Sequence, residues 1–227
     1  MSVIAALIST RDGTVASDGR QFTSVWLHNN VPSEPPGIAT DDFDKTFSLD
    51  GGKIVGAFCG LVKFSGATIA EHIRDITNGC FSKGATFGQV VERVEQQLTS
   101  RLNEINCSEV IPSYRNVDLV LAGGVQLARR EMRIAAMRFC WLSDGVSPTK
   151  EIVAADKNNR FYVYGEDLAA GTAAKTFKDS QVSDRDADFL MRLTTEAVTA
   201  GIMNCGIDKN GIHPACGGRV FIRRTWY

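Results

Sequence analysis

Short apolar stretches separated by turn residues open the chain and predict two pairs of β-strands. Residues 2–9 and 14–17 form the first pair, and the residues between them, 11–13, end in Asp-Gly, a strong hairpin dipeptide. Residues 45–49 and 54–58 form the second pair, again around a glycine-containing turn. Hairpins, which join neighbouring antiparallel strands, are therefore the expected unit of this half of the chain.

Two segments after these strands carry apolar residues at helical spacing. In residues 67–76 the spacing is set by isoleucines, and residues 87–105 carry a longer apolar stripe. Thr86 and Gln89 can form a capping box at the start of the second helix. The stripe of the second helix consists of Phe87, Val90, Val91, Val94, Leu98, Leu102 and Ile105.

The rest of the chain predicts strands, then two helices, then a final strand. Further helices are expected at residues 168–177 and 184–203, where Ser183 and Asp186 offer a capping box. The polar, Pro-containing residues 31–44 predict a surface loop. Further strands are expected at residues 117–124, 133–143, 149–155, 160–165 and 217–224.

This order of elements favours the α+β class. Dominant hairpins indicate antiparallel sheets, and two helix pairs need two sheet faces to cover. The economical solution is a four-layer αββα sandwich, in which two antiparallel sheets are flanked by helix pairs. One core then uses the whole chain, so we expect a single domain over residues 1–227.

Composition excludes several classes of protein. The chain has 227 residues, of which 44% are hydrophobic, and a formal net charge of -1. A dedicated nucleic-acid surface needs clustered Lys and Arg, which this balance does not provide. No apolar run reaches the length of a membrane-spanning helix, and no signal-peptide pattern opens the chain. The six cysteines lack the spacing of a zinc site or a disulfide framework, so we expect a cytoplasmic protein with reduced thiols and no metal or cofactor.

The polar run Ser17-Asp18-Gly19-Arg20, which ends the first hairpin, suggests a site. If Met1 is removed, Ser2 carries both a hydroxyl and the free α-amine, whose pKa of about 7.7–8.0 lets it act as a general base toward its own side chain. Such a nucleophile needs a nearby cation and a carboxylate to place it, and Lys45 and Asp18 fit these roles. Each residue also has an ordinary explanation: Ser is a common second residue, Asp before Gly forms turns, and a lone Lys is usually solvated.

An ordered set of motifs resembles the proteasome β-subunit family, including its bacterial ring-protease homologues. Residues 17–20 resemble the family's return-strand element, and Lys45 lies ahead of an apolar strand that ends Ala57-Phe58-Cys59-Gly60. Residues 118–123 resemble the next core strand, and Cys216-Gly217-Gly218-Arg219-Val220 resembles the late Ser-Gly-Gly strand. The family has the αββα fold of N-terminal nucleophile hydrolases.

The resemblance implies a role for each matching residue. Ser2 takes the place of the N-terminal threonine nucleophile, Asp18 orients Lys45, and Lys45 lowers the pKa of the α-amine and assists proton transfer. The Gly60 N–H supplies the oxyanion hole and helps hold a peptide as an added strand. Gln21 and Phe22 are expected near the substrate backbone, and Phe58 and Val62 in the pocket for the residue before the cut.

The sequence also departs from the family pattern. The nucleophile is Ser rather than Thr, and Gly13 lies closer to Asp18 than the family's turn glycine does. Residues 164–167 replace the family's serine-glycine segment, and the insertion ahead of Lys45 is long. His213 and Cys216 stand where the family has an aspartate and a serine, as candidate supporting residues.

The first functional prediction is a hydrolase: a protease that cleaves peptides or unfolded proteins inside a homo-oligomeric ring, with an ATP-dependent unfoldase as a candidate partner. One alternative is a catalytically inactive scaffold or binding ring that retains Met1. Another is an N-terminal nucleophile amidase that acts on small amides, because the fold alone does not settle the substrate.

Overall fold

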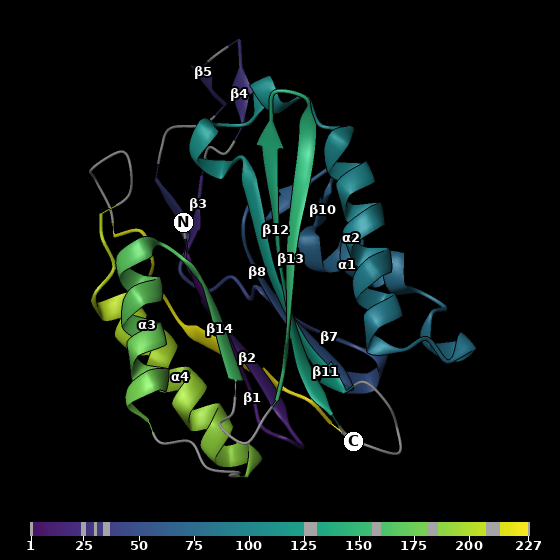
Figure 1. Ribbon diagram of the computed structural model, residues 1–227. Helices are drawn as coiled ribbons and strands as arrows, with labels where there is room; N and C mark the ends of the chain where they lie inside the picture. Colours follow the sequence, from purple (N-terminus) through teal and green to yellow (C-terminus); the bar gives the residue numbers. More distant parts are fainter. Residues whose placement is uncertain are drawn as a thin grey trace.

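The structure, a computed structural model, describes residues 2–23, 26–29, 31–33, 37–124, 131–155, 160–180, 186–207 and 214–226. Its elements place it in the mixed α+β class (Figure 1), which confirms the predicted class. Two antiparallel sheets contain the long strands, and the helices lie outside them. The described part of the chain contains no helix that is long and apolar enough to cross a membrane.

The first sheet has four strands in the order β14-β1-β2-β15. The opening hairpin is confirmed: β1 pairs antiparallel with β2, and the turn between them is closed by a hydrogen bond from Ser9 N to Asp12 O of 2.9 Å. Two distant segments complete the sheet, because β14 pairs with β1 and β15 pairs with β2. The strands are β1 (Val3–Ile8), β2 (Gly13–Asp18), β14 (Arg160–Gly165) and β15 (Val220–Arg224).

The second sheet has five strands in the order β13-β12-β11-β8-β7. All neighbouring strands are antiparallel, as the hairpin pattern predicts. Strand β13 begins earlier than expected, because Leu142 pairs with Gly145 across a tight turn. The strands are β7 (Thr46–Leu49), β8 (Ile54–Gly60), β11 (Asn116–Gly124), β12 (Met132–Leu142) and β13 (Gly145–Ala154).

The described residues contain four α-helices, and side-chain caps fix where each begins. Thr86 and Gln89 form the predicted capping box of α2, and Thr68 with Glu71 forms another at α1. Asp186 is the N-cap of α4, and its carboxylate accepts from Phe189 N at 2.8 Å; Ser183 lies outside the described residues. The helices are α1 (Ile69–Thr77), α2 (Phe87–Asn103), α3 (Asp167–Asp179) and α4 (Ala187–Met203).

Each sheet contributes residues to two hydrophobic clusters, because successive side chains of a strand point to opposite faces. One cluster joins the five-stranded sheet to α1 and α2, and another joins the four-stranded sheet to α3 and α4. A third contains residues of both sheets, such as Ile4 and Ile8 of β1 with Val55 and Ala57 of β8. Figure 1 accordingly shows α1 and α2 on one side of the molecule, α3 and α4 on the other, and the strands between them.

The predicted surface loop at residues 31–44 is more regular than expected. Strands β4 and β5 form a small hairpin, and β6 pairs with β3, the continuation of the opening hairpin. This pairing satisfies backbone groups that a polar loop would otherwise leave to water. The short strands are β3 (Gln21–Phe22), β4 (Leu27–His28), β5 (Val31–Pro32), β6 (Ile38–Thr40), β9 (Lys63–Phe64) and β10 (Ala67–Thr68).

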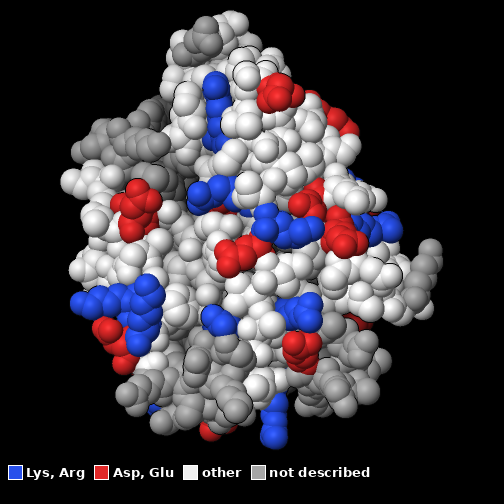
Figure 2. Space-filling view, in the orientation of Figure 1, with Lys and Arg blue, Asp and Glu red and all other residues white. Residues whose placement is uncertain are grey.

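The charged residues are mixed on the face shown in Figure 2. Blue and red side chains alternate across the described surface, without a large area of one sign. Several of them form ion pairs that join neighbouring elements, such as Lys150 of β13 with Glu95 of α2. On this face, the charges are therefore mixed rather than gathered in one patch of a single sign.

Candidate active site

A buried ion pair between Lys45 and Asp18 lies at the end of the opening hairpin. The Lys45 Nζ atom is 3.0 Å from Asp18 Oδ1, and the two side chains are 1% and 0% exposed. The ammonium also donates to the backbone oxygens of Asp18 at 3.0 Å and of Arg20 at 2.5 Å. Three acceptors therefore satisfy the three donors of the ammonium, as a charge taken out of water requires.

The Asp18 carboxylate joins three segments of the chain. Its Oδ1 atom accepts from Lys45 and also from the backbone N of Val3, at 3.2 Å. Its Oδ2 atom accepts from the backbone N of Gly217, at 3.1 Å. One oxygen thus binds both the buried ammonium and the residue directly after Ser2, so the cation lies close to the start of β1.

Ser2 is 5% exposed and lies at the first position before β1. Its carbonyl oxygen accepts from Glu166 N at 2.9 Å, which fixes the backbone of Ser2 against the end of β14. Gly165 permits this approach: its φ is +144°, and an added Cβ would lie 2.2 Å from the Ser2 oxygen. A glycine at this position is therefore needed for the backbone of Ser2 to lie where it does.

A pocket of about 250 Å³ opens beside Ser2. This volume is smaller than the roughly 300–1,000 Å³ of sites for drug-sized ligands, and it suits a single side chain or small acyl group. Gly60 lines the pocket, and its φ of +89° places it in the left-handed region that favours glycine. The lining comprises Ser2, Cys59, Gly60, Ser113, Tyr114, Asn116, Asp118, Arg138, Cys140 and Gly165.

A second ion pair, between Asp118 of β11 and Arg138 of β12, forms part of the pocket wall. Arg138 Nε donates to Asp118 Oδ1 at 2.5 Å, and Nη2 donates to Oδ2 at 3.2 Å. The hydrogen bond to Asp118 is the main reason that the pKa of Arg138 is raised above its usual value. The Cys59 thiol lies 3.8 Å from Asp118 Oδ2, and burial raises the pKa of that thiol well above its usual value. Cys59 is therefore a protonated core thiol rather than a nucleophile at neutral pH.

The structure brings together Ser2, Asp18, Lys45 and Gly60 in one region, as expected from the sequence. Both residues that were expected to line the pocket lie elsewhere. Phe58 and Val62 belong to the core between the five-stranded sheet and the helices α1 and α2, so they do not line the pocket beside Ser2. The reason is the alternation of side chains along β8: Phe58 points toward the helices, and Cys59 points toward the other sheet.

The residues expected near a substrate backbone lie in the strand that follows β2, beyond Asp18. Gln21 and Phe22 form β3 and pair with β6, and neither lines the pocket. Before them, the Arg20 side chain donates to the carbonyl oxygens of Pro214 at 3.0 Å and of Cys216 at 3.3 Å. Arg20 therefore fixes the segment before β15 whose Gly217 N–H reaches Asp18, a role that the sequence alone did not indicate.

The candidate supporting residues have different positions. His213 lies outside the described residues. Cys216 is buried, and burial raises the pKa of its thiol well above the usual value, so it is neutral near pH 7. Glu166, in the segment that replaces the family's serine-glycine pair, accepts from Ala169 N at 2.9 Å and from Gly206 N at 3.2 Å. Its carboxylate thus caps α3 and contacts the chain after α4.

Among the described residues, no group of His, Cys, Asp and Glu side chains is arranged to hold a metal ion. No protein-family model matches the chain, and no curated protein matches it.

Proposed function

We propose that this chain is a proteasome-like N-terminal nucleophile peptidase whose nucleophile is Ser2 after removal of Met1. The observation that carries the proposal is the shared oxygen of Asp18, which accepts from both the Lys45 ammonium and the backbone N of Val3. Burial of the ion pair is not explained by stability alone, because two apolar side chains of the same shape are often at least as stable. Proximity to the first residue of β1 provides one.

In the proposed reaction the free α-amine of Ser2 takes the proton of the Ser2 hydroxyl, and Oγ attacks the carbonyl carbon of the scissile amide. The Lys45 ammonium favours the neutral amine, and the Gly60 N–H stabilises the oxyanion. The tetrahedral intermediate then collapses, the C–N bond breaks, and the leaving amine takes the proton. Water hydrolyses the remaining ester and restores the hydroxyl.

The proposal extends to the architecture and the assembly. The three hydrophobic clusters support the αββα sandwich of N-terminal nucleophile hydrolases. One cluster joins the two sheets, and each of the other two joins one sheet to its own helix pair. A homo-oligomeric ring, cytoplasmic location and cooperation with an unfoldase follow from the resemblance to the proteasome β-subunit family. In such a ring the substrates are peptides or unfolded proteins.

A second candidate function is a catalytically inactive ring that serves as a scaffold and retains Met1. The observation that favours it is the use of Glu166, whose carboxylate is engaged as a helix cap where the family has a small supporting serine. A third candidate, an amidase for small amides, is favoured by the modest size of the pocket, about 250 Å³.

Two measurements test the proposal. The intact mass of the native protein shows whether Met1 is absent, as the enzyme requires, or retained, which favours the scaffold. Hydrolysis of a panel of short peptides and simple acyl amides is then compared between the wild type and the variants Ser2→Ala, Ser2→Thr and Ser113→Ala.

We expect Ser2→Ala to abolish hydrolysis while the oligomeric state is kept, and Ser2→Thr to retain it, because threonine preserves both the hydroxyl and the α-amine. Ser113→Ala is the matched control, since it removes another hydroxyl from the same pocket wall. Full turnover in Ser2→Ala would remove Ser2 from the mechanism. Retained Met1 together with no hydrolysis would leave the scaffold function.

A further inference from the structure

The proposed mechanism does not use Arg138, although its side chain lies in the wall of the pocket that contains Ser2. Strand β12 carries it, in an otherwise apolar stretch, directly opposite Asp118 in the register of β11 and β12. Asp118 is buried, and a buried carboxylate is costly unless a cation and hydrogen-bond donors are bound to it.

The two members of the pair differ in exposure. The Asp118 side chain is 4% exposed, whereas that of Arg138 is 44% exposed. Asp118 also accepts from Asn116 Nδ2 at 3.1 Å, so its oxygens are occupied by neighbouring donors. Among the described residues, no acceptor is hydrogen-bonded to Nη1 of Arg138, although Nε and Nη2 both bind Asp118. The Nε and Nη2 atoms of the guanidinium are therefore bonded to Asp118, and the N–H groups of Nη1 remain available to a ligand.

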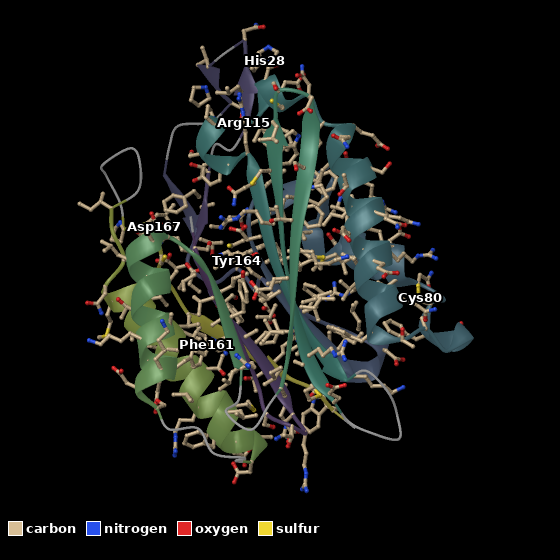
Figure 3. The ribbon with its side chains drawn as sticks, in the orientation of Figure 1. His28, Cys80, Arg115, Phe161, Tyr164 and Asp167 are labelled. Carbon is tan, nitrogen blue, oxygen red and sulfur yellow. The ribbon has the colours of Figure 1, made fainter. Side chains whose placement is uncertain are left out.

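The guanidinium is also held in place from the side of the first sheet. Its central carbon lies 5.0 Å from the centre of the Tyr164 ring, within the range of a cation–π interaction. Figure 3 shows Tyr164 in the middle of the molecule, on β14. Since Asp118 and Tyr164 fix the guanidinium from two sheets, little conformational entropy is lost when an anion binds to it.

A second hollow, of about 400 Å³, runs along β14 and shares Arg138 and Gly165 with the pocket beside Ser2. Asp167 lines this second hollow, and Figure 3 shows it at the start of α3. Its carboxylate disfavours an anion there by like-charge repulsion. The pocket beside Ser2 also contains a carboxylate, that of Asp118, but Arg138 and Asn116 donate to its oxygens, whereas no donor among the described residues is hydrogen-bonded to the Asp167 carboxylate. An anion that reaches Arg138 is therefore expected to bind on the side of Ser2.

We propose that Arg138 is a specificity-determining residue that binds a carboxylate of the substrate in the pocket beside Ser2. This inference rests on the proposed function and names its substrate class: peptides with an acidic residue or a free carboxyl end close to the bond that is cut. Arg recognises carboxylates through fixed, paired donors, which a lysine at the same site does not reproduce.

The experiment uses acetylated, amidated peptides in matched pairs that differ only in Glu or Gln, with the variable residue moved through each position around the scissile bond. A third series carries Gln and a free C-terminal carboxylate, which separates a side-chain carboxylate from a chain end. Turnover is measured with the wild type, and binding is measured by calorimetry with Ser2→Ala, which does not require catalysis.

Four variants define the role of the guanidinium. Arg138→Gln removes the charge, and Arg138→Lys keeps it without the paired donors. Because Arg138→Gln leaves Asp118 buried without its cation, the double variant Asp118→Asn/Arg138→Gln provides a neutral pair that avoids this cost. Arg133→Met is the matched control, because Arg133 lies on the same strand, pairs with Glu131 and does not line the pocket.

We expect one position at which the carboxylate peptide is preferred at least 10-fold, about 1.4 kcal/mol, in the wild type and in Arg133→Met. The preference should be lost in Arg138→Gln and in the double variant, and weakened in Arg138→Lys. Equal binding and turnover of Glu and Gln peptides in the wild type would overturn the proposal, and so would a preference that survives Arg138→Gln. If no peptide is hydrolysed but the Arg138-dependent binding preference is found, the site stands and the peptidase function fails.

Discussion

The buried pair of Lys45 and Asp18 leads to a prediction about stability that holds whether or not the protein is an enzyme. In Lys45→Met the aliphatic stem is kept and the ammonium is lost, so the carboxylate of Asp18 remains buried with only its two backbone donors. Removing one partner of a buried pair typically costs about 3–5 kcal/mol. That is a large part of a typical unfolding free energy of about 5–15 kcal/mol.

The magnitude follows from the burial. Both side chains are at most 1% exposed, so water and salt screen the interaction little. A loss of this size should lower the melting temperature on the order of 10 °C for a chain of this length. Lys53→Met is the control: Lys53 forms an ion pair with Asp50 at the surface, and we expect its loss to cost less than about 1 kcal/mol.

The assay is urea unfolding followed by circular dichroism, applied to Lys45→Met, Asp18→Asn and the double variant. Because the double variant contains no unpaired buried charge, it should be more stable than the sum of the single effects implies, with a coupling energy of about 2–3 kcal/mol. The reasoning is refuted if Lys45→Met costs no more than Lys53→Met. It is also refuted if the single effects add within about 0.5 kcal/mol.

Two further predictions concern the environment of Ser2 and the buried thiols. Gly165→Ala should destabilise the protein by about 2 kcal/mol or more in thermal unfolding, because its Cβ would meet the Ser2 carbonyl oxygen at 2.2 Å. Gly171→Ala in α3, where the space is open, should instead stabilise it by about 0.5–1 kcal/mol, and the reverse order of the two variants would contradict the geometry. The raised pKa of Cys216 predicts a stability that is complete below the unfolded thiol pKa of about 8.5 and falls as the pH rises above it. Cys216→Ala should reduce the slope of unfolding free energy against pH in that range by about 1.4 kcal/mol per pH unit, and an unchanged slope would show that the thiol ionises equally in both states.

Much of the secondary structure could be predicted because it is coded locally. The opening hairpin and the capping box of α2 are examples, since Thr86 and Gln89 are three residues apart and contact each other directly. The start of β13 was missed, because Gly145 and Pro148 are unfavourable in strands. The structure accommodates Pro148 because β13 is the edge strand of its sheet, where one side of the strand needs no backbone donor.

The candidate site could be predicted only in part. Asp18 and Lys45 were identifiable from their positions beside apolar strands, but the bond from Gly217 N to Asp18 joins residues that lie far apart in sequence. The resemblance to the proteasome β-subunit family placed Phe58 in the pocket. Strand limits could not test this, because they do not reveal which face a residue occupies, and a shift of one residue exchanges Phe58 with Cys59. Asp118 and Arg138 did carry a signal, a charge inside an apolar strand, but their contact depends on the register of β11 and β12.

The strand order of the four-stranded sheet has a consequence for how the protein is made. Strands β1 and β2 are central in that sheet, yet their outer neighbours β14 and β15 lie in the last third of the chain. During translation, the hairpin of β1 and β2 therefore emerges from the ribosome with both edges unpaired. Its edges stay unpaired until β14 and β15 have been synthesised. Such non-local pairing slows folding and exposes apolar strands to other molecules. Premature termination before β15 should consequently yield insoluble fragments rather than a smaller folded protein.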